Sequence, residues 1–275
     1  MTKRRIGIVG YGKLGQFLVQ GILERPESYE LAFVWNRNPA GIGSEIPAEI
    51  RLNDLADFKS RSPDLIVEVA HPIITQKWGQ QFLEYCDYMA GSPTAFADLE
   101  TECSMRATAA ISNGHGLYVP RGALPGLDEV LRMKASGKLA AARISMRKHP
   151  SSLKYSGPLD YPLEQTTTER VLYDGPLRKL CALAPNNVNT MAVLALSSEL
   201  GFDQVQAQLV ANPSLEHHIT ELVLLGPDTK GPRYSLKLLR ESPAGVGAVT
   251  STATLTTFLN SMLQSIGKGD GVHFC

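Results

Sequence analysis

The sequence has no excess of charge of either sign, no closely spaced cysteine pair and no long apolar run. Lysine plus arginine and aspartate plus glutamate number 27 each, so nothing favours nucleic acid or an anionic membrane as a partner. The cysteines are scattered without CxxC spacing, which predicts neither a metal site nor a disulfide framework. They are Cys86, Cys103, Cys181 and Cys275. No apolar run approaches the ~20 residues needed to cross a bilayer.

What is present is the composition of an ordinary globular protein. Of the 275 residues 43% are hydrophobic, which suits two modest domains better than one. The N-terminus leads directly into a short apolar strand rather than into the apolar core of a signal peptide, which runs for about 7 to 15 residues. We therefore expect a cytoplasmic protein that acts on a small molecule, as a homodimer, without a nucleic-acid or membrane partner.

The N-terminal part, residues 1–115, alternates strand and helix patterns. Residues 14–22 have helical spacing, which stops before Pro26. Strand patterns cover 6–9, 31–36, 64–70 and the start of 88–93. Alternation of this kind predicts an α/β fold with a doubly wound parallel sheet of the Rossmann type. Its ligand should bind beyond the carboxyl ends of the strands.

The pattern changes in residues 116–248, where short strand candidates follow one another, several with period-two alternation. They cover 142–148, 169–175, 205–211, 219–225 and 233–239. Two helical segments lie between them, 127–138 and 188–201, and we expect Gly201 to cap the second. The pattern predicts a second α+β domain with a mostly antiparallel sheet. The last segment, 249–275, should form a helix that packs back on the first domain.

A glycine-rich loop joins the first strand to the first helix. Gly10 permits the tight turn, Gly12 lets backbone approach a pyrophosphate, and Gly15 lets the helix close on the strand. Lys13 and Leu14 complete the loop. A purely structural glycine turn is the alternative, but the position between strand and helix favours dinucleotide binding.

The end of the second strand bears on the choice of cofactor. An acidic residue there would accept a hydrogen bond from the adenosine ribose, whereas this chain has Asn36 and Arg37. A guanidinium offers paired donors to a 2′-phosphate, so NADP should be tolerated or preferred over NAD. An exposed arginine that merely follows a strand is the competing interpretation.

Six motifs in order extend along the chain. They are GIVGYGKLG (7–15), VEVAHP (67–72), GSPTAFAD (91–98), VPRGALPGLD (119–128), LAPNNVNTMAVLAL (183–196) and VANPSLEHHITEL (210–222). With these motifs the sequence resembles the L-aspartate dehydrogenase family, specifically its animal branch of aspartate dehydrogenase domain-containing proteins. The resemblance implies NAD(P)-dependent oxidative deamination of L-aspartate to iminoaspartate, which hydrolyses to oxaloacetate and ammonia.

The resemblance also implies cofactor contacts. It assigns them to Ala123 and Asn189, and an amide could satisfy both the donor and the acceptor of a carboxamide. Alternatively, Ala123 only provides space, and Asn187 or Asn189 caps a helix. The same motifs add Ala70, His71 and Ser92, although a structural role is the stronger interpretation of His71.

The departure from the family lies in its catalytic histidine. Counting seven residues from Pro213 reaches Thr220, and the histidines stand instead at 217 and 218. Neighbours on a strand face opposite sides, so we expect only one of the pair to reach a substrate, with His217 preferred over His218. His149 is the candidate from another segment. Solvated imidazoles at a loop end are the alternative.

The remaining assignments concern substrate and function. Arg121 and Lys148 are candidates for binding the two carboxylates, with surface bases as the alternative. An imidazole suits proton removal from the substrate amine. Two other functions stay open: a dehydrogenase of another amino acid or of a sugar, and a catalytically weak NADP(H)-binding sensor or module.

Overall fold

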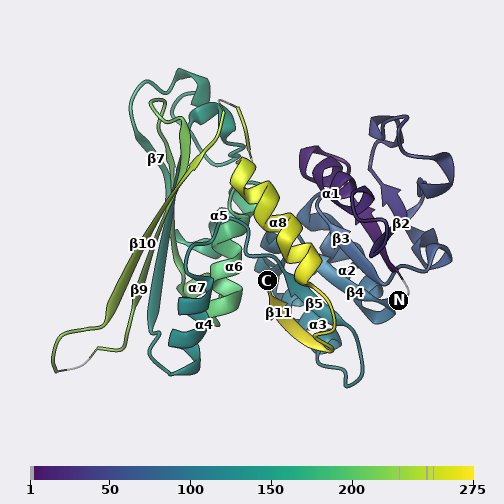
Figure 1. The fold of residues 1–275 in the computed structure, drawn as a ribbon. Helices are drawn as coiled ribbons and strands as arrows, with labels where there is room; N and C mark the ends of the chain where they lie inside the picture. Colours follow the sequence, from purple (N-terminus) through teal and green to yellow (C-terminus); the bar gives the residue numbers. More distant parts are fainter. Residues whose placement is uncertain (1–2, 229, 246, 250) are drawn as a thin grey trace. The chain divides into compact units, whose positions relative to one another are not determined.

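The computed structural model describes residues 3–228, 230–245, 247–249 and 251–275. The chain forms two compact units, each built on its own sheet (Figure 1). The first comprises Met1–Pro120 with Phe258–Cys275, and the second comprises Arg121–Thr257. The first unit therefore runs past residue 115, because the strand that follows residue 115 pairs into the first sheet.

The first unit is built on a six-stranded parallel sheet, as predicted, in the order β11-β5-β4-β3-β1-β2. Its strands are β1 (Arg4–Val9), β2 (Tyr29–Trp35), β3 (Leu65–Glu68), β4 (Asp87–Ala90), β5 (Gly116–Val119) and β11 (Gly271–Phe274). Its helices are α1 (Lys13–Leu23), α2 (Pro72–Tyr85) and α3 (Leu99–Ala109). The direction of strand order reverses between β1 and β3, which is where such sheets bind ligands.

The C-terminal segment completes this unit. Helix α8 (Thr252–Gln264) contributes Phe258 and Met262 to the same core as Ile8 and Leu18. Strand β11 was not predicted. It pairs in parallel with β5, and its four residues carry too little apolar pattern to reveal a strand without that partner.

The second unit carries a five-stranded sheet in the order β10-β9-β6-β8-β7. Only β6 and β8 pair in parallel, so a mostly antiparallel sheet is confirmed. The strands are β6 (Ala141–Lys148), β7 (Arg170–Pro176), β8 (Gln206–Ala211), β9 (His217–Leu225) and β10 (Ser235–Pro243). The helices are α4 (Leu127–Ala135), α5 (Leu177–Leu183), α6 (Asn189–Ser198) and α7 (Gly201–Gln204).

The predicted end of the second helical segment was wrong. Helix α6 ends at Ser198, and Glu199 takes the left-handed conformation at φ 57° that was expected of Gly201. An ion pair of Glu199 with Lys134 at 2.5 Å holds this unusual residue. Gly201, at φ 75°, instead begins α7.

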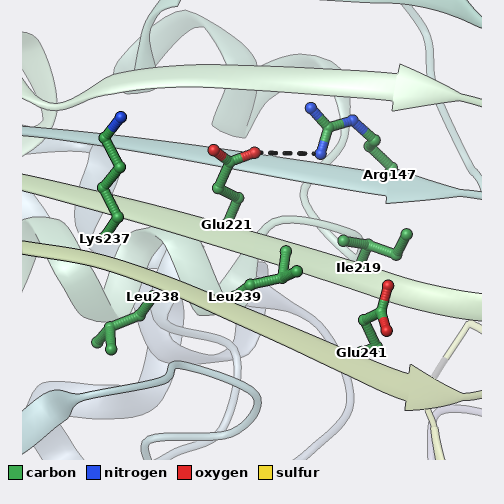
Figure 2. A pocket seen from close by; sticks show the side chains of 7 residues that line it. All are labelled: Arg147, Ile219, Glu221, Lys237, Leu238, Leu239 and Glu241. Atoms are coloured by element: carbon green, nitrogen blue, oxygen red, sulfur yellow. Dashed lines mark hydrogen bonds and ion pairs between the residues drawn. The ribbon is translucent and has the colours of Figure 1, made fainter.

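The second sheet has two different faces. Along β9 the side chains alternate between exposed or half-buried and buried. The buried side chains, such as Met146 on β6 and His218 and Leu222 on β9, form what we call the inner face. Figure 1 shows the helices of this unit on one side of the sheet. The opposite set forms the outer face, where Arg147, Glu221 and Leu239 surround a depression of about 350 Å³ (Figure 2).

Two further findings concern membrane-spanning helices and metal ligands. No helix in the described ranges is both long and apolar enough to cross a membrane. Among the same residues, no three His, Cys, Asp or Glu side chains are grouped so that they could hold a metal ion.

Candidate functional site

The glycine loop follows β1, and its three glycines have different reasons to be glycine. Gly10 has φ +112°, and a Cβ there would lie 2.9 Å from Ala70 Cα. A Cβ on Gly15 would lie 2.0 Å from the Gly10 carbonyl oxygen. A Cβ on Gly12 would meet nothing within 4 Å. Packing therefore dictates the outer two glycines, whereas Gly12 faces open space that a ligand could approach.

The start of α1 fits an anion. Its N-cap is Gly12, which offers no side chain to the first backbone N–H groups. The first turn, from Lys13 through Leu14, contains no acidic residue, and Lys13 is exposed. Free N–H donors, the helix dipole and a lysine together favour a phosphate at this end.

Loops after four neighbouring strands share this edge of the sheet: β1, β2, β3 and β4 end just before Gly10, Asn36, Val69 and Gly91. Each end of the Asn36 amide has a partner within the protein, because Oδ1 accepts from the Tyr11 N–H at 3.3 Å and Nδ2 donates to the Asn38 carbonyl at 2.9 Å. Its observed role is to tie the β2 loop to the glycine loop.

The neighbouring side chains at this edge are Arg37 and His71. Arg37 is exposed, and no described residue forms an ion pair with it. His71 Nδ1 accepts from the Ile73 N–H at 3.2 Å and so caps α2, which supports the structural interpretation of this histidine. Burial, and then the charge of Arg37, lower the pKa of His71. A neutral His71 therefore leaves Arg37 as the cation at this end of β2.

Sequence reasoning missed Glu68, the last residue of β3. Its side chain is fully buried, and it accepts hydrogen bonds from Ala70, His71 and Ser92. Burial raises the pKa of Glu68 to about 7 against the opposing effect of these bonds. A carboxylate inside the otherwise apolar stretch 65–70 was the available signal.

In the second unit, the inner face carries a buried lysine at the end of β6. Lys148 is 3% exposed, and its Nζ donates to the Asn187 carbonyl at 3.3 Å. No described carboxylate pairs with it, and burial lowers its pKa to about 8. The Asn187 side chain bonds to Lys154 N at 2.7 Å and to the Ser152 carbonyl at 2.9 Å. Its amide therefore holds the loop beside Lys148 and does not cap α6.

A histidine stands near this lysine. His217 is exposed and His218 buried, which confirms that the pair faces opposite sides of β9. Among the described atoms, none hydrogen-bonds to His218 Nε2. Burial, and then the charge of Lys148, lower the pKa of His218 to about 4, although a hydrogen bond with the Ala248 backbone opposes them. His218 is thus neutral at pH 7, with Nε2 available as an acceptor.

The family position, Thr220, lies on the same face of β9 as His218 and is 2% exposed. A displacement by two residues along a strand keeps the side chain on one face, whereas a displacement by one residue reverses it. The structure therefore favours His218 over His217, the reverse of the order expected from the sequence.

Two arginines extend the cationic character of this unit. Arg240 is half-buried on β10, and its Nε donates to Ser242 Oγ at 3.1 Å. Burial, and then the charge of Arg121, lower the pKa of Arg240. Neither arginine has a carboxylate partner in the described part of the chain. By contrast, Arg147 on the outer face pairs with Glu221 at 3.2 Å (Figure 2).

The other candidates of the second unit lie in two segments. Gly122, beside Ala123, approaches Thr190 Oγ1, which a Cβ on Gly122 would meet at 3.9 Å. Ala123 and Asn189, the first residue of α6, therefore lie in adjoining segments. His149 Nδ1 lies 2.7 Å from Ser151 Oγ and accepts from the Ser151 N–H at 3.2 Å, so its side chain caps a short turn.

Comparison with known proteins agrees with this architecture. An aspartate dehydrogenase domain-containing protein of Xenopus tropicalis is 43% identical over 280 residues, 99% of this chain and 98% of the relative. The chain belongs to the family of aspartate dehydrogenase domain-containing proteins. Its family models match unit by unit: "Homoserine dehydrogenase, NAD binding domain" over residues 10–120 and "Aspartate dehydrogenase, C-terminal" over residues 129–261. The NAD-binding match implies NAD or NADP as cofactor.

More distant relatives of this aspartate dehydrogenase domain-containing chain extend the likeness. An L-aspartate dehydrogenase of Methanosarcina acetivorans is 28% identical over 93% of this chain and 97% of its own length. The crystal structure of an aspartate dehydrogenase from Thermotoga maritima superposes with a TM-score of 0.68 at 23% identity, covering 97% of this chain and 98% of that one. At that sequence identity the superposition is evidence of a shared fold alone. The chain is thus a member of an NAD-binding oxidoreductase family.

Proposed function

We propose that this protein catalyses the NAD(P)-dependent oxidative deamination of L-aspartate. The observation that carries the proposal is a set of cations for which the described residues provide no carboxylate partner, Lys148, Arg121 and Arg240, in the unit that also presents the neutral acceptor Nε2 of His218. Buried or half-buried cations without counter-ions are costly, and an anionic ligand relieves that cost. A substrate with two carboxylates and an amine matches this set.

His218 is the group that takes the proton. Its Nε2 accepts a proton from the substrate ammonium, and the freed nitrogen lone pair forms the C=N bond as the Cα–H bond breaks. The bound nicotinamide supplies the hydride acceptor for that bond. The product, iminoaspartate, adds water and releases ammonia to give oxaloacetate.

The low pKa of His218 is consistent with this role because it belongs to the protein without substrate. Two carboxylates bound near the imidazole would favour the imidazolium and raise its pKa. Lys148 remains charged below a pH of about 8 and can hold the carboxylate next to the reacting carbon. Arg121 and Arg240 are left for the second carboxylate.

The test is a substrate screen that follows the absorbance of the reduced cofactor. We expect reduction of the cofactor with L-aspartate, and its oxidation with oxaloacetate plus ammonium. Other amino acids and sugars serve as competitors in the same assay. Turnover with another amino acid or with a sugar, and none with L-aspartate, would show that the proposed substrate is wrong. Cofactor binding without any turnover would favour a binding module.

We also propose that Arg37 makes NADP(H) bind at least as tightly as NAD(H). Arg37→Ala should weaken NADP(H) by about tenfold, the effect of one charge-assisted hydrogen bond, and leave NAD(H) nearly unchanged. Titration of both cofactors measures this. Gly12→Val is the non-binding control, since the open space around Gly12 lets the protein fold while the valine blocks the phosphate approach. An equal loss for both cofactors would refute the role of Arg37.

A further inference from the structure

The carboxyl group of Glu68 connects two loops at the carboxyl edge of the parallel sheet. Its Oε1 accepts from Ala70 N at 2.6 Å, from His71 N at 2.8 Å and from Ser92 Oγ at 3.1 Å. Its Oε2 accepts from Ser92 N at 3.0 Å. Three backbone groups from the loops after β3 and β4 thus depend on one side chain.

The same carboxyl group also acts on the glycine loop, through packing. A Cβ on Gly10 would lie 2.8 Å from Ala70 N, so the glycine loop rests directly on the residue that Glu68 holds. Likewise, a Cβ on Gly91 would lie 2.2 Å from the Glu68 carbonyl oxygen. Loops after β1, β3 and β4 therefore meet around Glu68, at the point where the strand order reverses.

We propose that Glu68 is the positioning residue of the dinucleotide site, and that its charged carboxylate keeps these three loops in the arrangement that binds the cofactor. The inference depends on dinucleotide binding and not on the substrate that is oxidised. A failed substrate screen would therefore leave it standing.

The unequal use of the two oxygens makes the inference specific. A proton on the carboxyl group is most easily placed on Oε2, which accepts one bond while Oε1 accepts three. There it leaves Oε2 a weaker acceptor for the Ser92 N–H. In Glu68→Gln an amide NH2 at that position offers the Ser92 N–H no acceptor. Glu68→Gln should therefore lack the charged hydrogen bond to Ser92 at every pH.

The surroundings of Glu68 leave it as the group that titrates near neutral pH. Tyr88 on β4 has a pKa raised well above its ordinary value by burial and by Glu68. The His71 pKa is lowered by burial and by Arg37, which faces it from the end of β2. On β1 the residue paired with Glu68 is Val9. With a Glu68 pKa of about 7, the arrangement should change between pH 6 and pH 8.

The experiment is calorimetric titration with oxidised NAD, which lacks a 2′-phosphate that would itself titrate, at pH 6, 7 and 8. Wild-type affinity should rise by about tenfold from pH 6 to pH 8, the effect of one charge-assisted hydrogen bond. E68Q should bind equally at all three values and no more tightly than the wild type at pH 6. Glu30→Gln, which removes an exposed carboxylate from β2, is the matched control and should keep the wild-type rise.

Thermal unfolding without cofactor separates positioning from mere structure. The folded carboxyl group keeps its proton to a pH of about 7, while the unfolded one loses it near 4.5, so Glu68 lowers stability as pH rises through this window. At pH 8, E68Q should melt no lower than the wild type while binding NAD more weakly. Wild-type affinity for E68Q at pH 8, or a lower melting temperature alongside weaker binding, would overturn the proposal. If E68Q does not fold, the test uses the NAD affinity of the wild type and of Ser92→Ala. The absence of a rise in affinity from pH 6 to pH 8 in both proteins would equally overturn the proposal.

Discussion

The two faces of the second sheet use similar side chains in opposite ways. On β6, Arg147 points to the outer face and pairs with Glu221, whereas Lys148 points inward and has no carboxylate partner among the described residues. On β9, His217 is exposed, and His218 is buried with no described atom hydrogen-bonded to its Nε2. The outer arginine of β6 is thus neutralised by a neighbouring carboxylate, whereas the described residues provide none for the inner lysine.

The energetic cost of burying Lys148 supports a functional role for this lysine. Burial of an ammonium that has no carboxylate partner among the described residues lowers its pKa because the charge is poorly solvated, and the value of about 8 for Lys148 reflects that. Such perturbed groups concentrate at functional sites. A sheet stabilised only for folding would be expected to pair Lys148 as it pairs Arg147, so the difference between the faces supports the proposal that the inner face carries the site.

The largest effect is expected from the two histidines. His218→Ala should lower kcat with L-aspartate by about 10² to 10⁴, the usual cost of removing a positioned acid–base group. His217→Ala, the matched control on the outer face, should leave kcat unchanged. Steady-state turnover and cofactor affinity measured together exclude a packing defect. Equal losses in the two variants would remove the distinction between the faces.

The neighbouring pair on β6 gives the second comparison. Lys148→Met should lower kcat/KM by roughly 10² because it removes a charged hydrogen bond to a carboxylate, whereas Arg147→Met should have little effect. In the wild type, kcat/KM should fall above pH 8 as Lys148 loses its proton. Lys148→Arg should retain activity without that alkaline fall. An inactive Lys148→Arg would show instead that Lys148, and not His218, removes the proton.

The sequence predicted those features whose signals are local. The glycine loop, the strand and helix alternation and the opposite orientation of His217 and His218 all follow from spacing within one segment. What could not be predicted was which histidine points inward. Both faces of β9 are mixed, since Thr220 and Leu222 lie on one face and Ile219 and Val223 on the other, so hydrophobicity does not identify the buried face.

The missed residues depend on partners distant in sequence. Arg240 joins the inner face only because β10 pairs with β9 in a register that sets Arg240 opposite Thr220. Strand β11 exists because its residues add to β5, more than a hundred positions earlier in the chain. Glu68 was visible as a carboxylate in an apolar strand, but its role requires Ser92 from the next loop. Contacts between residues distant in sequence leave no periodic pattern within either segment, so they could not be predicted from the sequence.

A third comparison asks whether Arg240 serves the second carboxylate. Arg240→Gln should weaken competitive inhibition by the dicarboxylate succinate by about tenfold, the effect of one charged hydrogen bond, and inhibition by the monocarboxylate butyrate by less. Arg143→Gln is the matched control, because Arg143 already pairs with Asp174 at 2.7 Å. Equal losses for the two inhibitors would place Arg240 outside the recognition of the second carboxylate.

The smallest effect concerns acid stability, and it again separates His218 from His217. The folded pKa of His218 is about 4, against 6.5 for the unfolded chain, so between these values the unfolded state binds a proton that the folded state does not. This histidine therefore lowers stability as pH falls from 6.5 to 4. Relative to a His218→Gln variant, the free energy of unfolding of the wild type should fall by roughly 1 to 3 kcal/mol across that window, because one pKa unit corresponds to about 1.4 kcal/mol.

Denaturant unfolding of the wild type, His218→Gln and His217→Gln at pH 4, 5.5 and 7 measures this loss. The carboxylates that titrate in the same range are common to all three proteins and cancel in the differences. His217→Gln, the same substitution at the exposed neighbour, is the matched control and should not reproduce the effect of His218→Gln. If His218→Gln also followed the wild type, the imidazole would be titrating freely in the folded protein. The inner face would then be open to water around His218, and its cations would need no ligand to explain them.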